Sequence, residues 1–341
     1  MDERYLMTSV TRISDLEPNN FEVRKSPRGE WEHADYVVGR VLGTPTNLYR
    51  LELANGRLMD VMEGARVIGA LGTRTATLEA VGDWRSIGED GLMHALTGAG
   101  LFGKATSVAS WLGNLISLSY EGHVCRGGQK LSMGDFVRQA EPTVFSLPVI
   151  LLVGTSMSSG KTTSGRIIIH ELKRAGLKVA GAKFTGAGRY RDILSFQDAG
   201  ADIIVDFMDA GLPSTVVPEA RFIEAMNHML ALVQAARPDV LVAEAGASPL
   251  EPYNGEAAVK ALGSNVCCTV LCASDPYAVL GVQAAFELEP DLITGPAANT
   301  DAGIELVAKL TGRESLNLLQ EKSLPRLRAL LRERLPSGLL P

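Results

Sequence analysis

Cysteine is scarce in this sequence, and it does not follow a pattern used for metal binding or for disulfide frameworks. The 341 residues include four cysteines, Cys125, Cys267, Cys268 and Cys272, and none of them is spaced as Cys-x-x-Cys. The last three lie within the apolar run 266–272, which has the character of a strand. We therefore expect reduced cysteines packed in a core.

Long apolar segments and an excess of basic charge are also missing. No run approaches the length needed to cross a bilayer, and the charged start Met1-Asp2-Glu3-Arg4-Tyr5 does not have the apolar core of a signal peptide. The 33 Lys and Arg residues are outnumbered by 39 Asp and Glu, which gives a formal net charge of −6. This balance argues against a nucleic acid or an anionic membrane held by bulk charge, so we expect a cytoplasmic protein with neither as a partner.

The first part of the chain, residues 1–145, has the pattern of a β-rich domain. The length of the chain favours two domains, and hydrophobic residues at 46% are ample for packed cores. Residues 1–30 are polar and irregular, so we expect a loose arm or an edge segment there. From Tyr36 on, short runs of β-forming residues are broken by Gly and Asn, and Asn55-Gly56 between two runs is a strong hairpin signal. We predict a small β-barrel or sandwich that serves as an accessory domain. Three isolated histidines are expected in structural roles: His33, His94 and His123.

The second part, residues 146–341, alternates short apolar runs with amphipathic patterns of helical period. Such alternation predicts an α/β domain with a parallel sheet covered on both faces. The expected strands are 149–153, 178–183, 239–244, 266–271 and 291–295, and the expected helices are 161–175, 218–237, 276–288, 301–310 and 324–335.

A phosphate-binding loop is predicted where the first of these strands meets the first helix. A buried strand leads into a turn of small residues, whose N–H groups can face phosphate oxygens at the positive end of the new helix. Lys161 supplies a mobile charge for the terminal phosphates, and the Thr162 hydroxyl is placed to bind Mg²⁺. Five residues separate the two glycines instead of the usual four, with Thr155 in the usual place of the first glycine. The loop residues expected to bind are Gly154, Thr155, Ser156, Ser158, Ser159, Gly160, Lys161, Thr162 and Thr163.

Two further stretches carry charge to the ends of predicted strands. Glu244 ends the strand 239–244, and a carboxylate at that place beside a phosphate loop holds Mg²⁺ or its water. The segment after the strand 178–183 is expected to be flexible, and its cations could orient an anionic substrate and neutralise a transferred phosphoryl group. A solvated loop is the alternative. The charged residues of this segment are Lys183, Arg189, Arg191 and Asp192.

The order of these motifs resembles dethiobiotin synthetase, which belongs to the SIMIBI-type P-loop NTPases. The resemblance covers about residues 147–320 and rests on Gly154-Thr155-x4-Gly160-Lys161-Thr162, Lys183, Asp192, Glu244-Ala245-Gly246-Ala247-Ser248 and Asn299. It implies that Lys161 and Lys183 contact phosphates and substrate, and that Asn299 lies near the adenine. It also implies that Thr162, Asp192 and Glu244 surround Mg²⁺. Apart from the resemblance, Asp202 or Asp206 could serve in place of Asp192.

A second family fits other stretches of the same region. The segments 202–207 and 244–252 resemble the P-loop family that includes D-glutamate N-acetyltransferase. The N-terminal part follows neither family, because dethiobiotin synthetase has no such domain and the second family has a Rossmann-like one.

Three functions are compatible with these motifs. The first is an enzyme that uses ATP and Mg²⁺ to phosphorylate a small carboxylate or carbamate, as a kinase or ligase does, with Lys161, Lys183, Arg189 and Arg191 as its catalytic cations. The second is N-acyl transfer to an amino acid, in which the loop holds the phosphates of an acyl-CoA. The third is a GTPase switch or metallochaperone, although the guanine-reading Asn-Lys-x-Asp motif is missing and only Ser274-Asp275 or Asn299-Thr300-Asp301 could replace it. We expect a small anionic substrate and a homo-oligomer.

Overall fold

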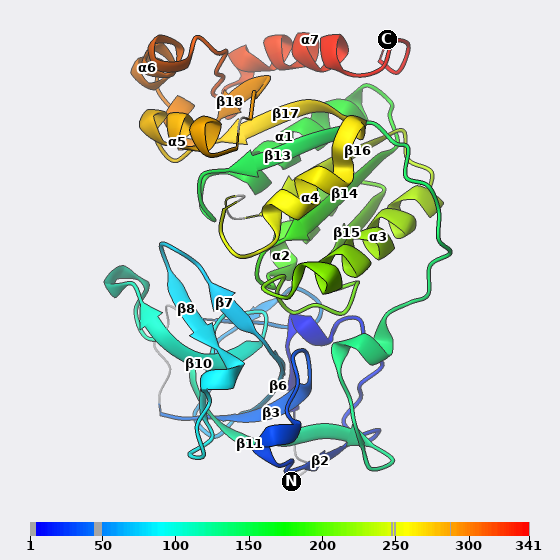
Figure 1. Cartoon of the computed structure of the whole chain (residues 1–341), viewed down its shortest axis with the longest axis vertical. Coiled ribbons are helices and arrows are strands. Elements are labelled where there is room, and N and C mark those ends of the chain that lie inside the picture. Colours follow the sequence, from blue (N-terminus) through cyan, green and yellow to red (C-terminus); the bar gives the residue numbers. More distant parts are fainter. Residues whose placement is uncertain (1–4, 44–49, 247, 249, 287, 341) are drawn as a thin grey trace. The chain divides into compact units, whose positions relative to one another are not determined.

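The computed structural model describes residues 5–43, 50–246, 248, 250–286 and 288–340 (Figure 1). Its contacts divide the chain into two compact units. The first comprises Met1–Gln139 together with Ala187–Arg191 and Phe207–Val217, and the second comprises Ala140–Gly186, Asp192–Asp206 and Pro218–Pro341. Two short pieces of the second half of the chain thus belong to the first unit, which the sequence did not suggest. A domain boundary between residues 145 and 146 stays a prediction.

The first unit is rich in β-structure, as predicted. Its strands are β1 (Tyr5–Met7), β2 (Glu22–Arg24), β3 (Tyr36–Val41), β4 (Leu51–Glu52), β5 (Leu58–Met59), β6 (Arg66–Leu71), β7 (Thr73–Thr75), β8 (Ala80–Asp83), β9 (Leu92–Ala95), β10 (Leu101–Val108), β11 (Ser117–Arg126) and β12 (Gln129–Lys130). Short 3-10 helices lie between them: η1 (Ser9–Thr11), η2 (Arg28–Glu30), η3 (Trp84–Ser86), η4 (Ser110–Leu112) and η5 (Met133–Phe136).

Strand pairing decides between the barrel and the sandwich. The pairings β6–β3, β3–β11, β11–β9 and β9–β10 are antiparallel, and a parallel pairing of β10 with β6 returns to the first strand. The five strands therefore close into a small barrel, which leaves no free edge within the ring. Its interior contains Val37, Leu71, Met93, Phe102 and Leu118, each with an exposed fraction of 1% or less.

Local predictions for the first unit can be compared with the structure. Asn55-Gly56 does connect an antiparallel pair, β4 with β5, and Gly56 has a φ of 82°. Residues 5–11 form an edge strand and a buried continuation instead of a loose arm, because β1 pairs with β6 and the Thr8 hydroxyl donates to the Ile68 carbonyl at 2.6 Å. His123 is fully buried and contacts Asp35 and Tyr120, as a structural histidine should.

The second unit is an α/β domain whose six-stranded sheet, within the described residues, has the order β15-β14-β16-β13-β17-β18 with all neighbours parallel. The strands are β13 (Val149–Gly154), β14 (Val179–Thr185), β15 (Ile203–Asp206), β16 (Val240–Ala245), β17 (Val266–Cys272) and β18 (Leu292–Thr294). The helices are α1 (Lys161–Arg174), α2 (Tyr190–Asp198), α3 (Glu219–Ala235), α4 (Gly255–Leu262), α5 (Pro276–Phe286), α6 (Asp301–Thr311) and α7 (Leu324–Arg334), with η6 (Gly263–Asn265), η7 (Pro296–Ala298) and η8 (Glu321–Ser323) between them.

The helices lie on both faces of this sheet. Helix α1 packs on β13, β14 and β16, while α3 packs on β14 and β15 and α4 on β14 and β16. In the strand order given above, the connection from β13 to β14 through α1 runs towards β15, whereas the connections from β15 to β16 through α3 and from β16 to β17 through α4 run towards β18. Because parallel crossovers are right-handed, connections that run in opposite directions place their helices on opposite faces of the sheet (Figure 1). Strand β13 is interior to the sheet and buried along its whole length. The loop after it therefore lies at the carboxyl edge between β16 and β17.

Two features of the second unit bear on the earlier expectations. The segment after β14, predicted to be flexible, includes the start of α2, so that Arg191 and Asp192 lie in the first turn of a helix. The cysteines are free, and Cys268 and Cys272 are buried in β17 as predicted. Burial raises the pKa of the Cys272 thiol to about 11, so that this group stays a thiol at neutral pH. In the part of the chain that the structure describes, no helix is both long and apolar enough to span a membrane.

Candidate functional site

The predicted phosphate loop connects the end of β13 at Gly154 to the start of α1 at Lys161. Both glycines suit the geometry of the loop, for different reasons. A methyl carbon added at Gly154 would lie 2.3 Å from Ser159 Oγ and 2.7 Å from Lys161 Nζ, and Gly160 has a φ of 96°. The loop therefore closes tightly over its own lysine, which is what a cradle for phosphate oxygens needs.

Lys161 lies inside this loop. Its side chain is buried, with an exposed fraction of 2%, and its ammonium donates to the Ser156 carbonyl at 2.7 Å and lies 3.4 Å from Ser159 Oγ. Burial lowers the pKa of Lys161, while the nearby charge of Glu244 opposes that shift. A phosphate oxygen could take the place of the Ser156 carbonyl as acceptor, because an anion is a stronger partner for an ammonium than a neutral carbonyl is.

The Thr162 hydroxyl donates to Glu244 Oε2 at 2.9 Å. Glu244 lies near the end of β16, the strand beside β13, and its exposed fraction is 3%. A hydroxyl and a carboxylate meeting at the start of the phosphate-loop helix are the hard oxygen donors that Mg²⁺ prefers. The residues present thus fit a magnesium ion. Among the residues that the structure describes, no group of three or more His, Cys, Asp or Glu side chains could hold a metal by itself, so water or phosphate oxygens would have to complete its coordination.

Lys183 and Asp192, both predicted site residues, form an ion pair with Nζ 2.5 Å from Oδ2. In the sheet Lys183 is in register with Asp206 on β15 and with Glu244 on β16, which places the three side chains on the same face. Asp206 is buried, with an exposed fraction of 1%. It therefore lies in the row of charged residues that includes Glu244.

Asp202, the other acidic residue considered for the metal, has a different role. Its carboxylate accepts hydrogen bonds from the Lys173 ammonium and from the Val179 N–H, each at 2.7 Å. Burial would raise its pKa, but these bonds outweigh burial and the pKa lies below the usual value. Asp202 thus fixes the start of β14, and of the two replacements only Asp206 is in register with Lys183.

The other predicted residues are placed as follows. Arg189 and Arg191 are exposed and belong to the segment that groups with the first unit, so their predicted part in substrate binding stays a prediction. Asn299 is exposed and directly follows η7. The turn before η7 packs on the phosphate loop, since a methyl carbon added at Gly295 would lie 2.4 Å from the Ser159 carbonyl oxygen. This places the segment that leads to Asn299 beside the loop, as the predicted contact with a base requires.

Sequence reasoning missed Ser274 as a neighbour of the loop. The Ser274 N–H donates to Thr155 Oγ1 at 3.0 Å, and the Thr155 hydroxyl donates to Ser274 Oγ at 3.2 Å. These contacts hold the first part of the loop against the end of β17. The next residue, Asp275, accepts from the Tyr277 and Ala278 N–H groups at 2.9 and 3.1 Å and so caps helix α5.

Glu52 of the first unit was also missed. Its buried carboxylate accepts from the Ser9 hydroxyl at 2.5 Å and from the Tyr190 and Arg191 N–H groups at 2.6 and 3.0 Å. Both N–H groups belong to the segment Ala187–Arg191, so these contacts lie within the first unit. The local sequence Leu51-Glu52-Leu53 reads as a strand with a solvent-facing glutamate, and no signal in it points to a distant helix.

Together, the interior strand, the tight loop and the helix on an all-parallel sheet form a P-loop α/β fold, as predicted. No protein-family model matches the chain, and no curated protein matches it by sequence. Among solved structures, chloroplast FtsY from Physcomitrella patens is 15% identical, with 52% of this chain and 59% of that one covered and a TM-score of 0.35.

Two other solved structures are similar at the same level. A DUF1611 family protein from Anabaena variabilis is 16% identical, and the match covers 61% of this chain and 65% of that one, with a TM-score of 0.35. A ParA family ATPase from Chlorobium tepidum is 14% identical, and the match covers 57% of this chain and 95% of that one, with a TM-score of 0.30. This chain thus spans less than two thirds of the FtsY and DUF1611 proteins. Similarity of this extent does not indicate a shared activity.

Proposed function

We propose that this protein is an ATP- and Mg²⁺-dependent enzyme that activates a small carboxylate or carbamate by phosphoryl transfer, as a kinase or ligase does. The contact between Thr162 and Glu244 carries the proposal, because it brings two metal-type oxygen donors to the first turn of α1, beside Lys161. A loop that only held an anion would not need a buried carboxylate at that point, since like charges repel.

Different residues of the loop would contact different parts of a bound triphosphate. The small residues before Lys161 leave room for phosphate oxygens, and Lys161 supplies a charge that is already buried and needs little further desolvation. Thr162 and Glu244 would hold Mg²⁺, which when bound supplies positive charge that helps to neutralise the phosphoryl group in transfer. Burial of Lys161 and Glu244 also keeps bulk water away from these charges, which strengthens their interaction with the nucleotide.

Lys183 is proposed to hold the substrate anion. Its pairing with Asp192 fixes the ammonium at the carboxyl end of β14, the edge of the sheet from which the phosphate loop also emerges. A substrate carboxylate could share this ammonium with Asp192, and the same charge would then stabilise the phosphoryl group as it moves towards the substrate.

ATP is favoured over GTP by the role of Asp275. In a guanine-reading site this carboxylate would accept hydrogen bonds from the base, but its Oδ1 already accepts from two N–H groups of α5 and its Oδ2 from the Ser274 hydroxyl. Acyl-CoA is disfavoured because the Thr162–Glu244 pair suits a metal-bound polyphosphate.

Calorimetry with ATP, GTP and acetyl-CoA, each with and without Mg²⁺, tests the proposal. We expect ATP to bind most tightly and Mg²⁺ to strengthen its binding at least about tenfold, which corresponds to ~1.4 kcal/mol. Thr162→Val should remove most of this Mg²⁺ effect. The matched control is Thr311→Val in α6, where the hydroxyl donates to the Val307 carbonyl and accepts from the Arg313 N–H. Tighter binding of GTP or acetyl-CoA, or equal Mg²⁺ effects in the two variants, would contradict the proposal.

A further inference from the structure

The main chain around Asn299, the residue predicted to lie near the adenine, is fixed on both sides. Its N–H donates to the Pro296 carbonyl at 3.2 Å, and its carbonyl accepts from Nδ2 of Asn317 at 2.9 Å. The next residue, Thr300, caps α6 by accepting from the Gly303 N–H at 3.1 Å. The backbone of Asn299 therefore has little freedom, although its side chain is exposed.

The carboxamide of Asn299 is available to a ligand. Within the described ranges of the chain it has no hydrogen-bond partner. A methyl carbon added at Gly160 of the phosphate loop would lie 3.4 Å from Gly295 Cα. The three residues of η7 then advance the chain by about 6 Å, a distance that a nucleoside can bridge. A carboxamide offers a donor and an acceptor side by side, which match N7 and N6 of adenine, whereas guanine presents two acceptors at this edge.

Asn317 links the segment around Asn299 to a turn 18 residues further along the chain. Its side chain is buried, with an exposed fraction of 6%, and its Oδ1 accepts from the Leu319 N–H at 3.1 Å. Its carbonyl accepts from the Gln320 N–H at 3.1 Å, which closes a turn over residues 317–320. Turn formation accounts for the contact with Leu319. It does not account for the contact with Asn299, which lies outside the turn.

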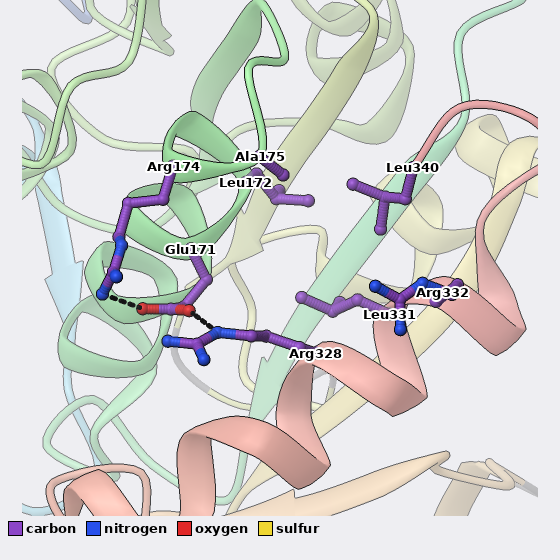
Figure 2. Close-up of a pocket in the computed structure, with 8 residues that line it drawn as sticks. All are labelled: Glu171, Leu172, Arg174, Ala175, Arg328, Leu331, Arg332 and Leu340. Carbon is purple, nitrogen blue, oxygen red and sulfur yellow. Dashed lines mark hydrogen bonds and ion pairs between the residues drawn. The ribbon is translucent and has the colours of Figure 1, made fainter.

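The turn over residues 317–320 is anchored on both sides. Before it, the Leu316 N–H donates to the Ile293 carbonyl of β18 at 3.0 Å. After it, α7 is attached to α1, the helix that begins at the phosphate loop, because Arg328 donates to the buried carboxylate of Glu171 (Figure 2). The turn is therefore a firm support for the segment that it contacts.

We propose that Asn317 is a positioning residue for recognition of the nucleotide base. It fixes the carbonyl of Asn299 and so holds the Asn299 carboxamide where it contacts the base. The inference rests on the proposed function, because it requires a nucleotide at the phosphate loop. Asn317 itself does not touch the base. It lowers the cost of ordering the Asn299 side chain on binding, which corresponds to about 2- to 12-fold in affinity.

Calorimetry on the full chain with ATP, GTP and tripolyphosphate, each with Mg²⁺, tests this role. The ratio of the ATP and GTP affinities measures recognition of the base, and tripolyphosphate, which has no base, reports on the phosphate loop alone. Asn317→Ala should weaken ATP binding about fivefold and bring the ratio towards one, with tripolyphosphate affinity within about twofold of the wild type. Asn317→Asp keeps the acceptor for the Leu319 N–H and loses the donor to Asn299, so it should lower the ratio in the same way.

A double-mutant cycle separates positioning from an independent contribution. Asn299→Ala should remove recognition of the base, and adding Asn317→Ala should then weaken ATP binding by less than about twofold, because a positioning residue acts only through the residue that it holds. The matched control is Asn20→Ala in the first unit. There Nδ2 likewise donates to a carbonyl, that of Asp15, and Oδ1 accepts from the Glu17 N–H. The control should change none of the three affinities.

Four results would overturn the proposal. Asn317→Ala could keep the wild-type ratio of ATP to GTP affinity, or lose tripolyphosphate affinity as much as ATP affinity. The two substitutions could have additive effects, or the wild type could bind ATP and GTP equally. A preference for GTP that Asn317→Ala abolishes would reject ATP as the nucleotide but support the positioning role. If none of the three ligands binds, the proposed function fails and this role fails with it.

Discussion

Replacing Gly154 by alanine should damage nucleotide binding while leaving the fold intact. The added methyl carbon would lie 2.3 Å from Ser159 Oγ, 2.7 Å from Lys161 Nζ and 2.9 Å from Lys161 Cδ, all too close for contact. These are side-chain atoms, so Ser159 and Lys161 can move, and Gly154 does not have a positive φ that alanine would strain. Hence we expect the free energy of unfolding to fall by less than ~1 kcal/mol, with Lys161 displaced from its place in the loop.

The size of the binding defect follows from that displacement. A hydrogen bond to a charged group contributes about 1.5–3 kcal/mol, so losing the Lys161 contact with phosphate should weaken Mg·ATP binding by roughly 10- to 150-fold. Calorimetry gives the affinity, and urea unfolding gives the stability of the same preparation. Gly176→Ala is the matched control, because Gly176 follows α1 with a φ of 89° and has nothing within 4 Å of the added carbon.

The control should show the opposite pattern. Gly176→Ala forces alanine into a left-handed conformation, so we expect a loss of about 1–2 kcal/mol in stability and unchanged nucleotide affinity. If Gly154→Ala bound Mg·ATP as tightly as the wild type, the close approach of Gly154 would not be what positions Lys161. If both variants lost stability and affinity together, the reasoning that separates the two effects would be wrong.

Two further predictions concern Lys183 and Asp35. Lys183→Ala should lower kcat at least about 100-fold, because the charge of Lys183 is needed mainly in the transition state. The Kd for ATP, measured by calorimetry, should stay within about threefold of the wild-type value. Equal losses of kcat and of ATP affinity, or the same loss of kcat in the control Lys178→Ala, would contradict this. Burial raises the pKa of Asp35, but bonds from His123, Lys130 and the Glu32 N–H outweigh it and lower the pKa. Its stabilising effect is therefore present above about pH 4 and is lost as pH falls further. Asp35→Asn should cost ~2–4 kcal/mol at pH 7 and flatten the acid side of a urea-unfolding pH profile, whereas the exposed Asp15→Asn should cost under ~1 kcal/mol.

The phosphate loop could be predicted from the sequence because its determinants are local. A buried strand, small residues at fixed spacing and a lysine at the start of a helix are all written within 149–163. The same holds for the alternation of strands and helices in the second unit, where hydrophobic period follows the local chain. Closure of the barrel depended on the parallel pairing of β10 with β6, more than 30 residues apart along the chain, and strand patterns alone do not encode such a pairing.

Contacts of single polar residues could not be predicted for a related reason. Glu52 binds N–H groups 138 and 139 residues away, and Ser274 contacts Thr155 at a separation of 119. Such contacts form only because the folded backbone brings distant residues together. The local sequence around a glutamate or serine at the end of a strand has no periodicity that would identify its partner. The Lys183–Asp192 pair is intermediate, because both residues were recognised but as binders of substrate and metal, not as partners of each other.

The composition of the first unit from three chain segments has a consequence for how this protein is made. Ala187–Arg191 and Phe207–Val217 complete that unit, with the Gly188 N–H donating to the Pro213 carbonyl at 2.9 Å and Arg12 pairing with Asp209 at 2.5 Å. A ribosome delivers these residues only after β13, α1 and β14 have emerged. An N-terminal domain that folds first during synthesis would therefore do so here without two of the segments that pack in the first unit. The β-barrel acquires its last contacts only when the phosphate loop already exists, and a chain cut after Gln139 would lack part of its own first unit.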